Sequence, residues 1–249
     1  MPLADKNGTR RLVALVPALN EADTVETTVT GLIDSIEGVE VYLVDDGSTD
    51  DTVVRAKSAG AEIISMPGNI GKGSAVNTAF NQINLADEDI LILIDADLGR
   101  TSIEAVKLVG PIIEGKTDMT IAVFLGPKSP GGFGLVKGLA RWGIKRFGTL
   151  DPKAPLSGQR AMKAGLFRAA GGLEPGFGME TGLTIDVLRQ GFSVTEIDTN
   201  MGHKETGRDI AGFIHRGSQF VAVAIAIAKR VIGLNSGANK TRRKPRIAP

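Results

Sequence analysis

The sequence predicts an α/β protein, built as a doubly wound, mostly parallel sheet with helices on both faces. Apolar segments typical of strands alternate with segments of helical periodicity through most of the first 124 residues. Repeated strand–helix units produce parallel strands, because the crossovers between them are right-handed. A hydrophobic content of 42% in 249 residues is ample for a buried core.

In the first half, we expect strands at 12–16, 41–44, 61–65, 90–94 and 119–124, and helices at 22–36, 50–59, 72–83 and 101–114. The strand at 90–94 is apolar throughout, which is typical of a parallel strand buried on both faces. Beyond it, Gly126 to Gly132 has the composition of a loop. We then expect a helix at 135–147, a short strand at 160–162, a helix at 181–189, a strand at 193–197 and a terminal helix within 209–233.

Charge is divided unevenly along the chain. Residues 1–209 hold 21 Lys and Arg against 28 Asp and Glu, whereas residues 210–249 hold eight basic residues and no acidic one. The longest apolar stretch there, Phe220 to Ala228, has nine residues, about half of the roughly 18–20 that a membrane-spanning helix needs. The helix in this basic end could pack on the rest of the fold, form a dimer or lie in the interface of an anionic membrane, and we predict no nucleic-acid partner.

The absence of cysteine excludes disulfides and thiolate-bound zinc. The segment Met1 to Lys6 lacks the apolar core of a signal peptide. We therefore expect a cytoplasmic protein, and we leave open a peripheral location at the inner face of the membrane.

Acidic residues follow two of the predicted strands. Asp45 and Asp46 follow the strand at 41–44, and Asp95 and Asp97 follow the strand at 90–94. Carboxyl ends of parallel strands lie at the sheet edge where ligands bind. In a turn, Asp95 and Asp97 can converge on one hard divalent cation, which prefers carboxylate oxygen. The alternative for the first pair is a turn followed by a helix cap.

A glycine-flanked lysine lies between the two acidic pairs, in Asn69-Ile70-Gly71-Lys72-Gly73. The glycines allow a ligand to approach the backbone closely, and the helix N-terminus together with Lys72 favours negative charge. The spacing is not that of a P-loop. With the acidic pairs, this segment predicts a nucleotide-sugar site, although Lys72 could also be an ordinary solvated lysine.

Four motifs in this order resemble the family 2 glycosyltransferases of the GT-A fold: Val16-Pro17-Ala18-Leu19-Asn20-Glu21, Val44-Asp45-Asp46-Gly47-Ser48, Gly71-Lys72-Gly73 and Asp95-Ala96-Asp97. The resemblance is close over residues 12 to about 100 and looser to about 210. It implies a flexible N-terminus at 1–10, a GT-A catalytic domain at 11–208, a C-terminal helix at 209–235 and a basic flexible tail at 236–249. Within the domain, 11–125 would be the nucleotide-sugar half and 126–208 the acceptor half.

The resemblance also implies a donor site. Asp46 would accept a hydrogen bond from the base, with Asp45 nearby, and a carboxylate suits a uracil- or guanine-type edge because it cannot donate. Asp95-Ala96-Asp97 corresponds to the DxD motif, which binds the donor diphosphate through Mg²⁺ or Mn²⁺, with Asp97 as metal ligand and catalytic residue. The residues assigned to donor binding are Pro17, Asn20, Glu21, Asp45, Asp46, Lys72, Asp95 and Ala96.

The acceptor side is assigned by resemblance to the Ser-Gly segment of these enzymes, and it consists of Ser157, Gly158, Gln159 and Arg160. Arg160 could hold a phosphate or a carboxylate by a fork of donors. Glu180 would be the catalytic carboxylate near the acceptor, but many relatives have a Glu-Asp pair where this chain has Glu180 followed by Thr181. The alternative is that Glu180 only caps a helix.

The Gly176–Leu183 segment is also similar to the related glucosyl-3-phosphoglycerate synthases, in which a later histidine completes the metal shell. That similarity assigns His203 as a second metal ligand, against the alternative of a loop residue. Lys204 and Arg208 would close over the diphosphate as part of a lid.

We therefore predict a metal-dependent glycosyltransferase that moves a hexose from a UDP- or GDP-sugar to a phosphorylated acceptor, either a polyprenyl phosphate or a small phospho-acid. A sugar-phosphate nucleotidyltransferase is one alternative, but the segment after the first strand lacks the glycine-rich, basic loop that such an enzyme needs. A non-catalytic nucleotide-sugar-binding protein is another. The sequence leaves open the base, the sugar, the acceptor, the stereochemical outcome and a homodimer, including whether the C-terminal helix packs in that dimer or lies on a membrane.

Overall fold

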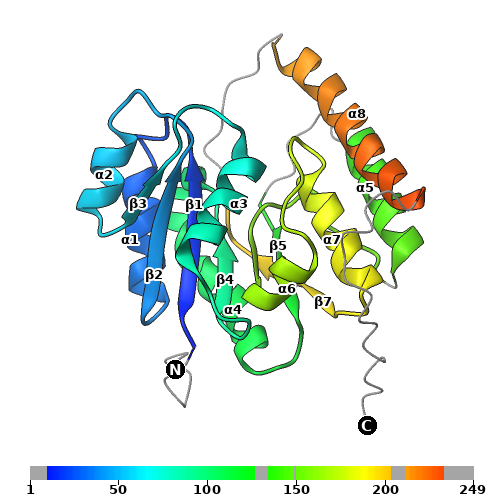
Figure 1. The fold of residues 1–249 in the computed structure, drawn as a ribbon, viewed down its shortest axis with the longest axis horizontal. Coiled ribbons are helices and arrows are strands. Elements are labelled where there is room, and N and C mark those ends of the chain that lie inside the picture. The colour runs from blue at the N-terminus through cyan, green and yellow to red at the C-terminus, as the bar shows by residue number, and fades with distance from the viewer. Residues whose placement is uncertain (1–9, 127–133, 149, 203–210, 233–249) are drawn as a thin grey trace.

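The computed structural model describes residues 10–126, 134–148, 150–202 and 211–232, and it describes side chains of the last range from residue 220 onward. Its centre is a seven-stranded sheet with helices on both faces (Figure 1). The strand order is β3-β2-β1-β4-β6-β5-β7. The predicted doubly wound, mostly parallel sheet is confirmed.

The first half follows the predicted alternation. Its strands are β1 (Leu12–Ala18), β2 (Val39–Asp45), β3 (Glu62–Ser65) and β4 (Ile90–Leu93), and their pairings with one another are parallel. Its first helices are α1 (Val25–Ser35), α2 (Thr52–Ser58) and α3 (Lys72–Ile83). The predicted start of the helix at 101–114 is wrong. A 3₁₀ segment, η1 (Ala96–Ala105), occupies residues 101–105, and the α-helix α4 (Val106–Ile113) begins after it. Gly99 interrupts η1 with a φ of 52°, a conformation that glycine adopts readily.

The second half adds one strand that runs against the others. Its elements are β5 (Met119–Phe124), α5 (Gly134–Phe147), β6 (Arg160–Lys163), α6 (Ala164–Ala169), α7 (Met179–Arg189), β7 (Val194–Thr199) and α8 (Ala211–Val231). The short helix α6 was not predicted. β6 is antiparallel to both β4 and β5, with Leu93 opposite Arg160. The amino end of β6 therefore lies at the same sheet edge as the carboxyl ends of the parallel strands.

Three apolar clusters hold these layers together. One sheet face packs against α1, η1 and α4, and the other packs against α3, α6 and α7. A third cluster joins α5, α7 and α8 and includes Ala140, Ile185 and Ile227. Because Gly143 has no side chain, Ile227 can approach closely: a Cβ there would be 2.5 Å from its Cδ1 atom. The C-terminal helix is thus packed against α5 and α7.

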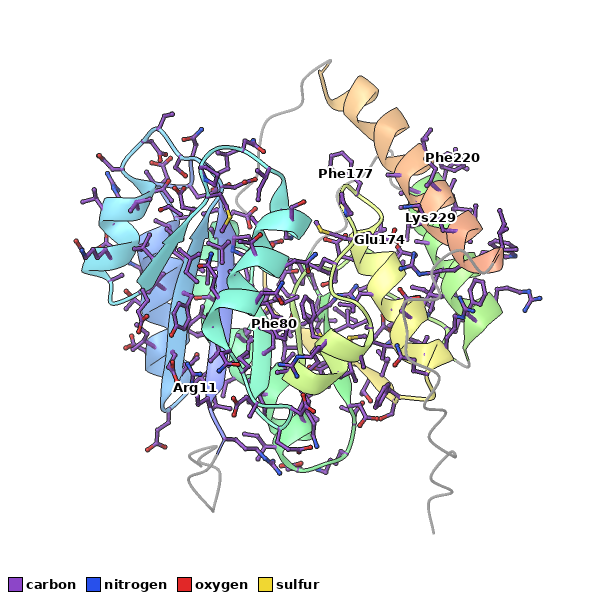
Figure 2. All side chains as sticks on the ribbon, viewed as in Figure 1. Arg11, Phe80, Glu174, Phe177, Phe220 and Lys229 are labelled. Carbon is purple, nitrogen blue, oxygen red and sulfur yellow. The ribbon has the colours of Figure 1, made fainter. Side chains whose placement is uncertain are left out.

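Within the described residues, no helix combines the length and the hydropathy needed to cross a membrane. The predicted flexible ends at 1–10 and 236–249 fall outside the described residues, apart from Arg10. Most of the predicted loop between Gly126 and Gly132 also falls outside them. Figure 2 shows the described side chains on the same view of the molecule.

Candidate functional site

The predicted motifs meet at the carboxyl edge of the sheet. The loops that follow β1, β2 and β4 emerge there because these strands are parallel neighbours. The Ser157–Arg160 segment reaches the same edge because β6 runs antiparallel to β4. Four segments that lie far apart in the sequence are therefore brought together by the order of the strands.

Hydrogen bonds connect the loops after β1 and β2. The side-chain oxygen of Asn20 accepts a bond of 2.8 Å from the backbone N–H of Thr49, and the Asn20 N–H donates to Ser48 Oγ at 3.0 Å. Asn20 has a φ of 57°, a left-handed conformation that asparagine tolerates better than most residues. Asn20 thus fixes the shape of the loop that leads from β1 to Glu21.

The second acidic residue after β2, Asp46, reaches across to the glycine-rich segment. Its two oxygens accept the backbone N–H groups of Ile70 and Gly71, at 2.8 and 2.9 Å. Asp45 accepts the N–H of Ser48 at 2.9 Å and is buried. In this structure both carboxylates organise the loops, and their assignment to the nucleotide base stays a prediction.

Lys72 and Asp95 form the centre of the site. The Lys72 ammonium is 2.5 Å from one oxygen of Asp95, and the Gln159 amide donates to the other oxygen at 2.7 Å. The same ammonium is 3.8 Å from Glu180. Burial by itself would lower the pKa of Lys72, but the attraction of Asp95 and Glu180 outweighs it and the pKa is raised. Lys72 is therefore a cation held between two carboxylates.

Arg160 is completely buried behind this pair, with 1% of its surface exposed. It donates from Nε to the Ser157 carbonyl at 2.9 Å and from Nη1 to the Thr184 hydroxyl at 2.8 Å. Its Nη2 is buried without a hydrogen-bond partner among the described residues. Burial lowers the pKa of Arg160 to about 10, so the guanidinium remains charged at neutral pH. The predicted contact between Arg160 and the acceptor is not tested by this arrangement.

Glu180 lies in the first turn of α7, where the helix dipole favours a carboxylate. Burial raises its pKa, and the nearby charges of Lys72 and Arg160 act in the opposite direction. Gly182, two residues further, lies on the far side of the helix against Arg230. Glu180 is thus a largely buried carboxylate, with 13% of its side chain exposed, and it has two cationic neighbours, an environment typical of functional groups.

A small cavity of about 10 Å³, roughly the size of one water molecule, lies among these residues. Its lining includes six of the residues assigned from the sequence: Pro17, Lys72, Asp95, Gly158, Arg160 and Glu180. Gly158 is required for this closeness, because a Cβ there would be 2.9 Å from Lys72 Nζ and 3.1 Å from Asp95 Oδ2. The segments assigned from the sequence to donor and acceptor binding therefore meet at one centre, and these roles stay predictions.

A second concentration of negative charge lies beside that centre. Burial raises the pKa of Glu21, and the neighbouring charges of Asp97 and Asp95 raise it further. Such a carboxylate set is chemically suited to a hard divalent cation. Within the described residues, however, no three His, Cys, Asp or Glu side chains are close enough to hold a metal by themselves.

The remaining predicted ligands, His203, Lys204 and Arg208, fall outside the described residues. The described chain stops at Gly202, whose N–H and carbonyl both lie within hydrogen-bond distance of the Thr101 hydroxyl, at 3.2 and 3.3 Å. Thr101 belongs to η1, which begins directly after Asp95. Gly202, the residue before His203, therefore lies against η1, the element that follows the DxD turn.

Sequence reasoning missed an ionic cluster that attaches α8 to α7 and to the segment before it. Arg230 donates to both oxygens of Asp186 on α7, with Nε 2.9 Å from Oδ1, and to Glu174 at 3.1 Å. Gly182 makes this approach feasible, since a Cβ there would be 2.7 Å from Arg230 Nη2. The glycine in the middle of a helix was the available sequence signal for such a close contact.

An acidic site at the carboxyl edge of a doubly wound sheet is typical of the α/β proteins that bind nucleotides there. The family model for glycosyl transferase family 2 matches residues 13–156, more than half of the chain. The chain therefore belongs to glycosyl transferase family 2, and the family predicted from the four motifs is confirmed.

Two relatives show how far the similarity extends. Glucosyl-3-phosphoglycerate synthase of Mycobacterium tuberculosis (strain ATCC 25618 / H37Rv) is 30% identical over 205 residues, which cover 72% of this chain and 61% of that protein. Glycosyltransferase AglJ of Haloferax volcanii is 30% identical over 200 residues, covering 78% of this chain and 64% of that protein. The matches thus span less than two thirds of the length of these relatives.

Solved structures give the same picture of the fold. The crystal structure of the M. tuberculosis synthase in complex with Mg²⁺ and uridine diphosphate matches with a TM-score of 0.70 at 26% identity, over 92% of this chain and 82% of that chain. The same enzyme with Mn²⁺, uridine diphosphate and glucosyl-3-phosphoglycerate matches with a TM-score of 0.70 at 25% identity, over 91% and 83%. The predicted GT-A fold is confirmed.

Proposed function

We propose that this protein is a metal-dependent glycosyltransferase that moves a hexose from a UDP-sugar to a phosphorylated acceptor. The observation that carries the proposal is the shared centre in which Lys72, Asp95 and Glu180 line one cavity. Asp95 and Glu180, which are 85 positions apart in the sequence, converge there. The relatives support the donor, because the structures of the M. tuberculosis synthase contain uridine diphosphate with Mn²⁺ or Mg²⁺.

A divalent cation fits the residues that are present. Asp97 is one proposed ligand, and its charge contributes to the raised pKa of Glu21. The carboxylates of the described residues do not complete a metal coordination shell alone, and oxygens of the donor diphosphate would complete it. His203 is the second proposed ligand, and the Gly202–Thr101 contact supports it by placing the preceding residue near the DxD turn. When bound, the metal supplies Lewis-acid stabilisation of the charge that develops on the departing nucleoside diphosphate.

The protein side chains have separate tasks in this proposal. Lys72 adds positive charge where the diphosphate binds, and Asp95 is kept in one orientation by Lys72 and Gln159. Glu180, as a buried carboxylate, can accept a hydrogen bond from a sugar or acceptor hydroxyl. Arg160 helps to keep Glu180 ionised, since its charge lowers the pKa that burial raises.

Two forms of the phosphorylated acceptor are compatible with the sequence. A small phospho-acid is supported by the relatives named glucosyl-3-phosphoglycerate synthase, one of whose structures contains phosphoglyceric acid. A polyprenyl phosphate is supported by the basic C-terminal region, with eight basic and no acidic residues after residue 209. The cytoplasmic location and the homodimer stay predictions.

The test combines donor binding with transfer. The full chain is first screened by thermal shift with UDP-, GDP- and dTDP-sugars and Mn²⁺, because a ligand that binds the folded state raises the melting temperature. Transfer from UDP-glucose is then followed by mass spectrometry with 3-phosphoglycerate, or with polyprenyl phosphate in detergent, as acceptor. We expect UDP-sugar binding and transfer to one acceptor, both abolished by EDTA.

Asp87→Asn is the matched control for Asp97→Asn, because Asp87 is an exposed acidic residue whose ion pair is with Arg168, away from the cavity. We expect the control variant to keep wild-type transfer and Asp97→Asn to lose it. Absence of binding to any UDP-sugar in the presence of Mn²⁺ would contradict the proposal. So would equal transfer by the two variants.

A further inference from the structure

The outer face of α8 carries a row of exposed apolar side chains. Their exposed fractions lie between 41% and 69%, and they are Phe220, Val221, Ile225, Val231 and Ile232. Val221 and Ile225 are four residues apart and so lie on one side of α8, and Ile232 follows directly after the helix, where its N–H donates to the Ala228 carbonyl at 3.0 Å. A contiguous apolar stripe on a protein surface is typical of an interaction site.

The opposite face of α8 is already packed against the rest of the fold. The inner face of α8 contributes Val223 and Ile227 to the apolar cluster with α5 and α7, and Ala226 is also buried. Arg230 adds the ionic contacts with Asp186 and Glu174. Among the residues that the structure describes, none covers this outer face, which is therefore available to a partner.

Positive charge accompanies the stripe. Lys229 projects from α8 with 45% of its side chain exposed, and Figure 2 shows it on the same helix as Phe220. The whole chain from residue 210 to residue 249 contains eight basic residues and no acidic one. An apolar helix face that is continuous in sequence with a basic segment is the pattern of helices that lie in the interface of an anionic bilayer.

The neighbouring helix α5 presents a second feature of the same kind. Its exposed side has a shallow groove lined by Arg141, Trp142, Lys145 and Arg146. Asp151 neutralises part of this charge through ion pairs with Arg141 and Lys145. An exposed tryptophan beside cationic side chains suits a membrane interface, where the ring lies at headgroup level and the charges reach lipid phosphates.

We propose that the outer face of α8, together with Trp142 of α5, docks on the surface of a bilayer that contains anionic phospholipid. Charge distinguishes this occupant from a second copy of the chain. A two-fold pairing through α8 would bring the same surface of both copies together, and thus two basic segments that repel each other. An anionic membrane attracts both the charges and the apolar stripe. The inference does not depend on which acceptor the enzyme uses.

The chain provides its own reporter, because Trp142 is the single tryptophan in the sequence. The full chain is titrated with vesicles of phosphatidylcholine alone and of phosphatidylcholine mixed with phosphatidylglycerol, and binding is measured by sedimentation and by Trp142 emission. We expect binding and a blue shift with the mixed vesicles, and at least tenfold weaker binding to phosphatidylcholine alone, roughly the loss of attraction to a few basic residues.

Two charge-introducing variants test the surface. Ile225→Glu places a charge in the stripe, and we expect it to weaken binding to the mixed vesicles by about tenfold or more. Val54→Glu is the matched control, because Val54 is 64% exposed on α2, and we expect it to bind as the wild type does. A thermal shift with UDP-sugar, measured without vesicles, verifies that both variants are folded.

Three results would overturn the inference. One is an unchanged Trp142 emission with mixed vesicles, and another is equal vesicle binding by Ile225→Glu and the wild type. The third is a dimer in light scattering that Ile225→Glu converts to a monomer without weakening vesicle binding, since the stripe would then be a subunit interface. Because the donor assay with UDP-sugar contains no lipid, failure of this inference is distinguishable from failure of the proposed activity.

Discussion

Replacing Arg230 with methionine tests whether the ionic cluster on α8 stabilises the acceptor half. Arg230 is 2% exposed, and methionine preserves much of its volume while removing the charge. Asp186 and Glu174, which are 13% and 17% exposed, would then face each other without their counter-ion. Removing one partner of a buried ion pair costs about 3–5 kcal/mol. For a domain of this size, each kcal/mol shifts the melting temperature by about 2–4 °C, so Arg230→Met should melt roughly 6–20 °C lower.

Calorimetric or fluorimetric melting of the purified variants measures this effect. Lys229→Met is the matched control, because Lys229 is the neighbouring residue on the same helix and its contact with Glu174 is an exposed pair at 4.0 Å. Such pairs contribute about 0–1 kcal/mol, and we expect the control to melt within about 4 °C of the wild type. Arg230→Met melting that close to the wild type, or a Lys229→Met shift of equal size, would refute the reasoning.

The pH dependence provides a second check on the same cluster. Burial raises the pKa of Asp186 in the folded protein, although its hydrogen bond to Arg230 acts in the opposite direction. A carboxyl group with a raised pKa stabilises the fold at acidic pH, and this contribution is lost as the pH rises through the folded-state pKa. Loss of Arg230 should raise that pKa further. The destabilisation of Arg230→Met should therefore be smaller at acidic pH than at neutral pH.

Other predictions concern the shared centre of the site. Gly158→Ala places a methyl group between Lys72 and Asp95. We expect the affinity for UDP-sugar to fall about tenfold or more, which is about 1.4 kcal/mol, with little change in melting temperature. An unchanged affinity in calorimetric titration would contradict this. Lys72→Met removes a charge that lowers the pKa of Glu180, so the acidic limb of the pH–activity profile should move to higher pH. A profile identical to that of the wild type would show that Glu180 does not act as a carboxylate in the reaction. Arg160→Lys keeps the positive charge, and we expect a smaller displacement of that limb than with Arg160→Met.

Much of the fold could be predicted because its signals are local. The apolar run at 90–94 is sufficient to place β4. Gly71 is sufficient to place the start of α3, which begins at Lys72 as expected. The helix predicted at 101–114 starts late because Gly99 and the contacts of Ser102 with α1 favour a 3₁₀ path, and these contacts are not visible in local sequence. The hydrophobic periodicity of the sequence likewise does not show that β6 runs antiparallel to its neighbours.

The candidate site was predictable where residue type and strand order suffice. Asp95, Lys72 and Glu180 each lie in a recognisable motif, and strand order brings them to one edge. Their mutual contacts could not be predicted, because the Lys72–Asp95 pair depends on side chains from α3 and the β4 end. The Arg230 cluster joins residues 44 and 56 positions apart in sequence, and its pairing follows from tertiary packing alone.

Calorimetric titration with UDP-glucose, in Mn²⁺ and in EDTA, tests most directly whether the acidic sheet edge holds the donor through a metal. The wild type should bind in Mn²⁺ and lose at least about tenfold in affinity in EDTA, whereas Asp97→Asn should bind weakly in both. The control Asp87→Asn should behave as the wild type. Equal affinity of the wild type and Asp97→Asn for UDP-glucose in Mn²⁺ would contradict the account.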